Sequence, residues 1–208
     1  IKNAKRGYIH MRPLHPLDFI FLNLEKRQQP MHVGGLFLFE LPKDASATFV
    51  HDLVEDIRQS KSIPVPPFNN QLNGLFWGED NEFDIDHHFR HIALPKPGRI
   101  RELLVYISQQ HSSLIDRAKP LWTCDIIEGI EGNRFAMYCK IHHAMVDGVA
   151  GMRLIEKSLS KDPAEKHVVP LWCVESKRTK RLKNSKDVAS SKMKGLMKGI
   201  KSQLEVTP

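Results

Sequence analysis

Two apolar runs joined by a glycine-containing turn constrain the fold of this chain more than any other feature. Residues 121–128 and 134–142 each have the length and composition of a strand, and residues 129–133 have the length of a hairpin connection. Alternation assigns the side chains of the second run to two faces, with Phe135, Met137, Cys139 and Ile141 on one and Ala136, Tyr138, Lys140 and His142 on the other. The sequence therefore predicts a β-hairpin whose second strand delivers His143 to its end.

Helical and strand periodicities surround this hairpin. Apolar residues at helical spacing predict helices over residues 16–27, 47–60, 99–111 and 148–160. Strands are expected at residues 33–41 and 83–89, and the prolines of residues 63–67 predict a long loop that reaches towards Trp77. This mixture predicts an α/β fold, in which a mixed β-sheet has flanking helices.

The positive charge is concentrated near the end of the chain. The sequence has a net charge of +7, but ten of its 31 Lys and Arg residues, and one of its 24 Asp and Glu residues, lie between Ser176 and Lys201. The rest of the chain is almost balanced, which argues against a nucleic-acid-binding face. Residues 175–208 are expected to be a basic linker with an amphipathic segment, which fits either a solvated connection or contact with an anionic lipid surface.

The cysteines and the first residues indicate an intracellular protein. Cys124, Cys139 and Cys173 lack metal-ligand spacing and are expected to be reduced thiols in a cytosolic protein. No apolar run is long enough to span a membrane, and no secretory signal is recognisable. Met11 is expected to be the natural start, with residues 1–10 as a non-native or upstream extension and residues 11–174 as the folded domain.

Two groups of histidines are candidates for chemistry. The first comprises His87, His88 and His91 with Asp84 and Asp86. Because neighbouring residues of a strand point to opposite faces, His87 and His88 are not expected to reach one ion together. No metal site is therefore predicted.

The second group is the run His142-His143-Ala144-Met145-Val146-Asp147-Gly148, which lies where a strand gives way to a loop and a helix. Alternation lets only one imidazole face a cleft, and an imidazole can take and return a proton near neutral pH. Asp147 could accept a hydrogen bond, pair with a buried arginine or cap the following helix, and Gly148 would permit a tight turn. By itself, a lone His-His pair is more often structural than catalytic.

The run matches the HHxxxDG motif of a superfamily that includes chloramphenicol acetyltransferase, plant acyltransferases and peptide-synthetase condensation domains. Further segments resemble the bacterial bifunctional wax ester synthase/diacylglycerol acyltransferases. These are residues 11–19, 25–35, 87–91 and 97–103 and Pro120-Leu121-Trp122. The resemblance extends from Met11 to Trp172. It implies the N-terminal half of a chloramphenicol-acetyltransferase-like enzyme with two domains.

The resemblance also implies an activity and a set of site residues. The reaction would move a long-chain acyl group from acyl-CoA to a fatty alcohol or diacylglycerol, without an acyl-enzyme and without a bound cofactor. His143 would be the general base and His142 would support it. Asp147 would hold the loop through an ion pair with an arginine. Gly148, Pro120, Leu121 and Trp122 would contribute to substrate binding, although a well-packed strand start explains Pro120-Leu121-Trp122 equally well.

The resemblance also bears on partners, location and alternatives. Members of this family are about twice as long, so a C-terminal half is the expected partner, and little activity is expected of residues 1–208 alone. The expected location is cytoplasmic, with contact to the inner membrane face or lipid inclusions as an extension of it. The alternatives are a condensation-type enzyme that uses carrier-bound acyl groups and a non-enzymatic module that binds lipid surfaces.

Overall fold

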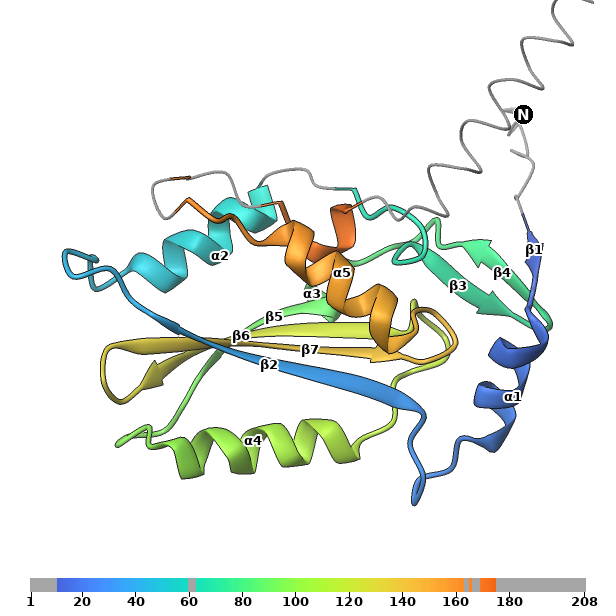
Figure 1. Cartoon of the computed structure of the whole chain (residues 1–208), viewed down its shortest axis with the longest axis horizontal. Helices are drawn as coiled ribbons and strands as arrows, with labels where there is room; N and C mark the ends of the chain where they lie inside the picture. Colours follow the sequence, from blue (N-terminus) through green and yellow to red (C-terminus); the bar gives the residue numbers. More distant parts are fainter. Residues whose placement is uncertain (1–10, 60–62, 163–164, 166–168, 175–208) are drawn as a thin grey trace, which may run out of the picture. The chain divides into compact units, whose positions relative to one another are not determined.

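The computed structural model describes residues 11–59, 63–162, 165 and 169–174, in which helices cover both faces of a β-sheet (Figure 1). The four strands of this sheet occur in the order β2 (His32–Glu40), β7 (Arg134–His142), β6 (Trp122–Ile130) and β5 (Phe89–Ala93). β5 and β6 are parallel, and the other neighbours are antiparallel. The predicted α/β fold with a mixed sheet is therefore confirmed.

The predicted hairpin forms the centre of the sheet. β6 and β7 pair antiparallel, and β6 continues to Ile130, so the connection is shorter than the sequence indicated. Gly129, Gly132 and Asn133 have positive φ angles in this turn region. Sγ of Cys124 lies 3.1 Å from Sγ of Cys139 across the two strands, and both thiols are free and buried. Burial and the partner thiol hold the pKa of Cys124 well above its usual range.

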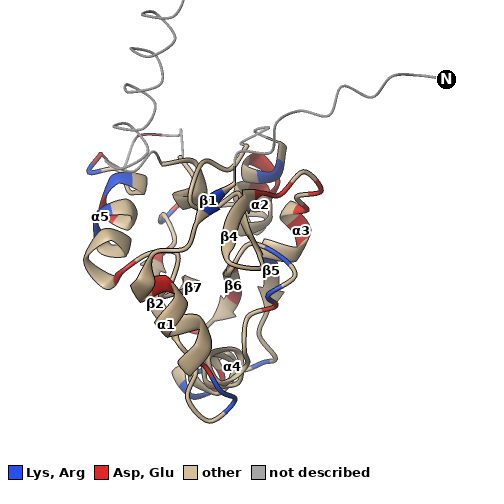
Figure 2. Cartoon of the chain, turned by 90° about the vertical axis from the view of Figure 1, so that its right-hand side faces the viewer, with Lys and Arg blue, Asp and Glu red and all other residues tan. Residues whose placement is uncertain are grey.

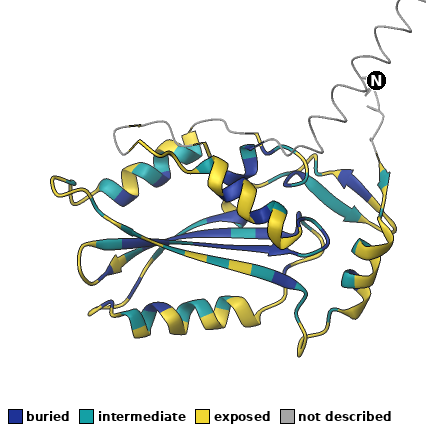
Figure 3. Ribbon diagram, viewed as in Figure 1, coloured by how far each residue is buried: buried dark blue, intermediate teal, exposed yellow. Residues whose placement is uncertain are grey.

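Helices cover the two faces of the hairpin, as the predicted fold with flanking helices requires. α2 (Phe49–Gln59) and α5 (Gly148–Ser158) lie on one side of the sheet, and α4 (Ile100–Ser112) lies on the other (Figure 1). β6 and β7 are mostly buried, whereas the outer side of α4 is exposed (Figure 3). The four predicted helices are confirmed, with ends displaced by at most three residues.

α1 (Pro16–Leu24) begins in a capping arrangement that uses a histidine. Nδ1 of His15 accepts a hydrogen bond from Leu17 N–H at 3.3 Å, and the Asp18 carboxylate accepts one from His15 N–H at 3.3 Å. The same carboxylate accepts a hydrogen bond from Nε1 of Trp77 at 3.2 Å, which ties the start of α1 to β4 (Phe76–Glu79). α1 is largely uncharged (Figure 2).

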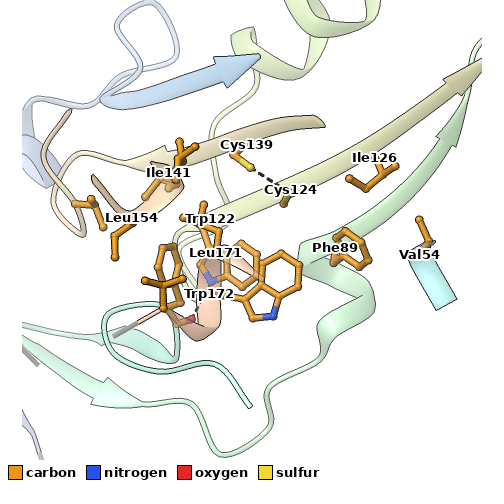
Figure 4. Close-up of a cluster of buried hydrophobic side chains, with 14 of the residues drawn as sticks. Val54, Phe89, Trp122, Cys124, Ile126, Cys139, Ile141, Leu154, Leu171 and Trp172 are labelled. Carbon is orange, nitrogen blue, oxygen red and sulfur yellow. Dashed lines mark hydrogen bonds between the residues drawn. The ribbon is translucent and has the colours of Figure 1, made fainter. Parts of the chain in front are cut away.

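A cluster of buried hydrophobic side chains, among them several aromatic rings, fills the core on the α2 and α5 side (Figure 4). Trp122 stacks on Trp172 of the 3₁₀ turn η1 (Leu171–Cys173), and its Nε1 donates to Phe68 O at 2.8 Å. Phe89 packs against Trp172 with ring centroids 5.1 Å apart. Phe68, Phe89 and Trp172, which are distant from one another in sequence, therefore pack together around the start of β6.

The expected strand at residues 83–89 is wrong. Asp84 caps a single helical turn, α3 (Ile85–His88), because its Oδ1 accepts a hydrogen bond from Asp86 N–H at 3.0 Å. The strand β5 begins only at Phe89. The alternation of apolar and polar residues that suggested a strand continues across a helix and a strand, since a four-residue helix is too short to display its own period.

The predicted loop at residues 63–77 is partly wrong, because it contains a short hairpin. β3 (Asn70–Asn73) and β4 pair around Gly74, whose φ is +59°, and β1 (Arg12–Pro13) pairs with β4. Strands of two to four residues show too little alternation to be recognised.

The expectations for residues 1–10 and 175–208 lie outside the described residues, including the basic amphipathic segment. Within the described part, residues of both charges occur (Figure 2). No helix of that part has the length and hydropathy needed to cross a membrane.

Candidate active site

The two histidines of the motif lie at the end of β7, where backbone hydrogen bonds hold them from two sides. His142 is the last residue of β7, and its N–H donates to Leu121 O at 2.9 Å. His143 N–H donates to Met31 O, just before β2, at 2.8 Å. The residues just before β6 and β2 thus fix the backbone positions of His142 and His143, from which the two imidazoles extend.

His142 points into the protein and is fully buried. Its Nδ1 accepts a hydrogen bond from Ala144 N–H at 3.0 Å, so the neutral ring carries its proton on Nε2. Burial lowers the pKa of His142 to about 4, against the partly compensating charge of Glu25. His142 is therefore a neutral residue that shapes the loop, consistent with a supporting role.

Glu25, which the sequence did not single out, is the residue that faces His142. Its Oε1 lies 3.4 Å from Nε2 of His142 and accepts a hydrogen bond from Met31 N–H at 3.1 Å. Arg117 binds the other carboxylate oxygen, with Nη2 to Oε2 at 3.0 Å. Burial alone would raise the pKa of Glu25, but the hydrogen bonds from Met31 and Arg117 outweigh it and hold the pKa below its usual value.

His143 is held by an aromatic ring. It stacks on Phe21 of α1, with ring centroids 4.3 Å apart and an interplanar angle of 22°. Its Nδ1 is buried and has no hydrogen-bond partner among the described residues. His143 is only half-buried, whereas His142 is enclosed, so His143 is the imidazole of the pair that a second molecule can approach.

Asp147 caps α5, which is one of the three roles that the sequence left open. Its Oδ1 accepts a hydrogen bond from Ala150 N–H at 2.7 Å. The ion pairs found among the described residues do not include one between Asp147 and an arginine. The capping bond is thus the contact that the described structure provides for this carboxylate.

Gly148 does not serve the tight turn that was expected. Its φ lies outside the left-handed region, and a Cβ built at this position meets no atom within 4 Å. The space beside Gly148 is open on the exposed side of the motif loop.

Pro120, Leu121 and Trp122 are all fully buried in the core. Leu121 belongs to a cluster of buried residues that also contains Ala144 of the motif loop. The structure therefore brings this segment directly beneath the motif, as part of the packing that supports it.

The other histidine group is separate from this site. His88 is fully buried, with Nδ1 2.8 Å from Trp122 O, and burial lowers its pKa to about 4. Because His87 and His88 lie in α3 and not on a strand, the geometric reason given for dismissing a shared metal was wrong. Within the described residues, no three or more His, Cys, Asp or Glu side chains lie close enough together to hold a metal.

Comparison with known families decides the affiliation. The profile of the wax ester synthase/diacylglycerol acyltransferase catalytic domain matches residues 14–207. The chain belongs to this family. It is 77% identical over 198 residues to the O-acyltransferase WSD of Acinetobacter baylyi, a match that covers 95% of the chain and 43% of that protein. The resemblance stated from the sequence is confirmed.

Solved structures agree with this affiliation. The wax ester synthase/diacylglycerol acyltransferase of Marinobacter aquaeolei VT8 superposes with a TM-score of 0.74 at 49% identity, over 78% of the chain and 40% of that structure. The first condensation domain of the calcium-dependent antibiotic synthetase matches at 14% identity and a TM-score of 0.52, over 69% of the chain and 36% of that structure, a likeness of fold alone. The chain spans less than half the length of each of these relatives.

Proposed function

We propose that the protein, at its natural length, transfers a long-chain acyl group from acyl-CoA to a fatty alcohol or diacylglycerol, with His143 as the general base. The observation that carries this proposal is the contrast between the two histidines. His142 is enclosed as a neutral ring beside Glu25, whereas His143 is half-buried and stacked on Phe21. Family membership supplies the acyl-transfer chemistry.

The reaction needs one group that takes a proton and later returns it. The imidazole of His143 removes the proton of the alcohol hydroxyl as its oxygen attacks the thioester carbonyl carbon. The tetrahedral intermediate then collapses, the carbon–sulfur bond breaks, and the imidazolium returns the proton to the departing CoA sulfur. No acyl-enzyme and no bound cofactor take part, and acyl-CoA is a co-substrate.

The remaining motif residues act on this histidine or on the substrates. His142 and Asp147 hold the loop, through Ala144 N–H and Ala150 N–H respectively. The open space beside Gly148 would accommodate a substrate. Pro120-Leu121-Trp122 would support the site from the core.

The partners and location proposed for the whole protein follow from the same family. A C-terminal half would complete the substrate channel. The enzyme would work in the cytoplasm, where its lipid substrates favour contact with the inner membrane face or lipid inclusions.

The test replaces His143 with glutamine in the protein at its natural length. Palmitoyl-CoA with hexadecanol, or with dipalmitoylglycerol, is supplied, and both free CoA and ester are measured. Loss of general-base catalysis should lower turnover by about 10²–10⁴-fold. The matched control is His51→Gln, because His51 is an exposed histidine of α2.

Two results would overturn the proposal. If the turnover of His143→Gln stayed within about tenfold of that of the parent, His143 would not be the general base. A parent protein that uses an acyl group on a carrier protein but leaves palmitoyl-CoA untouched would instead be a condensation-type enzyme.

A further inference from the structure

A buried lysine lies on the strand that leads to the site. Lys140 is only 4% exposed and stands on β7, two residues before His142 and on the same face. Its Nζ donates hydrogen bonds to Gln110 O at 2.6 Å and to Ser113 O at 2.9 Å. These carbonyls belong to the end of α4, where the helix leaves backbone acceptors unpaired and where its dipole favours a cation.

Two more side chains bind the same end of α4. Nε2 of His32 lies 2.7 Å from His111 O, and the Tyr138 hydroxyl lies 2.8 Å from Nδ1 of His111. A Cβ at Gly34 would lie 2.7 Å from the Tyr138 hydroxyl oxygen, so β2 approaches closely only because this residue is glycine. The end of α4 is therefore fixed to β2 and β7 by polar contacts.

The segment after α4 carries the residue that holds Glu25. Nη2 of Arg117 donates to the Glu25 carboxylate at 3.0 Å and to Leu22 O at 2.5 Å. The Glu25 carboxylate accepts from Met31 N–H, and Met31 O accepts from His143 N–H. These contacts, together with the four chain residues between Ser112 and Arg117, thus connect Lys140 to the backbone of His143.

Three charged groups face Lys140 from the surrounding elements. Burial lowers its pKa and the charge of Arg90 adds to this, while Asp125 and Glu25 act in the opposite direction. Asp125 already has partners of its own, because Arg90 binds it with Nε at 2.7 Å and Tyr106 donates to it at 2.8 Å. The two carbonyls of α4 are hence the direct partners of the ammonium group.

We propose that Lys140 is a positioning residue for acyl transfer: its ammonium group fixes the end of α4, and thereby holds Arg117 against Glu25, the carboxylate beside His142. This inference rests on the proposed function, since it concerns the same site. Lys140 touches neither the substrates nor His143, and it acts through the segment that contains Arg117.

The test is a double-mutant cycle in the protein at its natural length, with palmitoyl-CoA and hexadecanol as substrates. Lys140→Met keeps the length of the side chain and removes the ammonium, and it should lower kcat by about 10–100-fold, because small misplacements of a catalytic group have effects of this size. The KM for palmitoyl-CoA should change by less than about threefold if substrate binding is untouched. Lys157→Met, at an exposed lysine of α5, is the matched control and should leave both unchanged.

The cycle separates positioning from a general structural effect. If Lys140 acts through Glu25, then Lys140→Met added to Glu25→Gln should lower kcat by no more than about twofold beyond Glu25→Gln alone. Multiplicative losses, or a Lys140→Met variant with the kcat of the parent, would overturn the inference.

Two further results keep the two proposals apart. An inactive parent protein would refute the proposed function, whereas an active parent with an unaffected Lys140→Met variant would refute only the role of Lys140. If Lys140→Met does not fold, as judged by circular dichroism, His32→Leu takes its place in the cycle, because it removes the neighbouring contact with His111 O.

Discussion

Glu25 Oε1 lies 3.4 Å from Nε2 of His142, and the side chains of both residues are almost completely shielded from solvent. Because Nδ1 of His142 accepts a hydrogen bond from Ala144 N–H, the proton on Nε2 faces a carboxylate whose pKa is held below its usual value by hydrogen bonds from Met31 and Arg117. The same carboxylate binds Met31 N–H, next to the carbonyl that receives His143 N–H. One buried carboxylate therefore lies beside the His142 ring and binds the segment that holds the proposed base.

Replacing Glu25 with glutamine should lower both stability and turnover. The amide keeps an acceptor for Met31 N–H but loses the charge that pairs with Arg117. Because Arg117 is partly exposed, we expect the free energy of unfolding to fall by about 1–2 kcal/mol, less than for a fully buried pair. Urea unfolding measures this change, and kcat with palmitoyl-CoA should fall by about tenfold or more.

Glu156 of α5 provides the control for this change, because it is an exposed glutamate on another element. Glu156→Gln should leave stability within about 0.5 kcal/mol of the parent. Equal effects of the two substitutions would contradict a special role for Glu25.

Acid should destabilise the protein through two buried histidines. Burial lowers the pKa values of His88 and His142 to about 4, from an ordinary value of 6.5. Below pH 6.5 the unfolded chain binds protons that the folded protein does not, so the free energy of unfolding falls between pH 6.5 and 4. Each histidine should contribute up to about 3 kcal/mol to this loss.

Urea unfolding at pH 7, 5.5 and 4 measures the predicted loss. His88→Leu should make stability less dependent on pH in this window, because the proton-binding difference of His88 disappears. A stability that stays constant from pH 6.5 to 4 would show that neither ring is held neutral.

The fold could be predicted where patterns are long. The β6–β7 hairpin and helices α2, α4 and α5 each display their period over nine or more residues, and burial follows it. α3 and the β3–β4 hairpin could not be predicted, because elements of four residues are decided by contacts such as the Asp84 cap and not by a repeating pattern.

The site could be predicted only as far as the motif itself. Strand alternation distinguished His142 from His143, and the structure buries His142 at the end of β7 while His143 lies just beyond the strand. Glu25, Arg117 and Phe21 could not be assigned a role, because they act through contacts between segments far apart in sequence. Glu25 and Phe21 meet the two motif histidines, and Arg117 binds Glu25. Their side-chain types are common on surfaces and in cores alike.

Because Phe21 stacks on His143, we expect this contact to orient the His143 imidazole and so to affect turnover. Phe21→Leu keeps an apolar side chain but removes the flat surface 4.3 Å from the imidazole. We expect kcat to fall by about tenfold while the KM for palmitoyl-CoA changes little. Phe19→Leu is the control on the same helix, since Phe19 is exposed. Equal kcat for Phe21→Leu and the parent would contradict an orienting role for this stack.

Asp147 offers a choice between a helix cap and an ion pair. Asp147→Ala removes the oxygen that accepts from Ala150 N–H and should lower the free energy of unfolding by about 1 kcal/mol. Asp147→Asn keeps a capping oxygen without the charge and should restore most of this loss. Thermal or urea unfolding of the two variants checks the prediction. An asparagine variant as unstable as the alanine variant would indicate that the charge matters, as an ion pair with an arginine requires.

Substitution of Gly148 tests whether glycine is needed here for folding or for access of the substrate. Alanine at this position meets no atom within 4 Å, so stability should be unchanged or raised by up to about 1 kcal/mol. Gly34→Ala is the contrasting control, because its Cβ would lie 2.7 Å from the Tyr138 hydroxyl oxygen and should lower stability by about 1–3 kcal/mol. If a substrate occupies the space beside Gly148, Gly148→Ala should lower kcat/KM by about tenfold or more in a fully stable protein. Steady-state kinetics and urea unfolding of the same preparation decide this, and an unchanged kcat/KM would mean that no substrate approaches the residue.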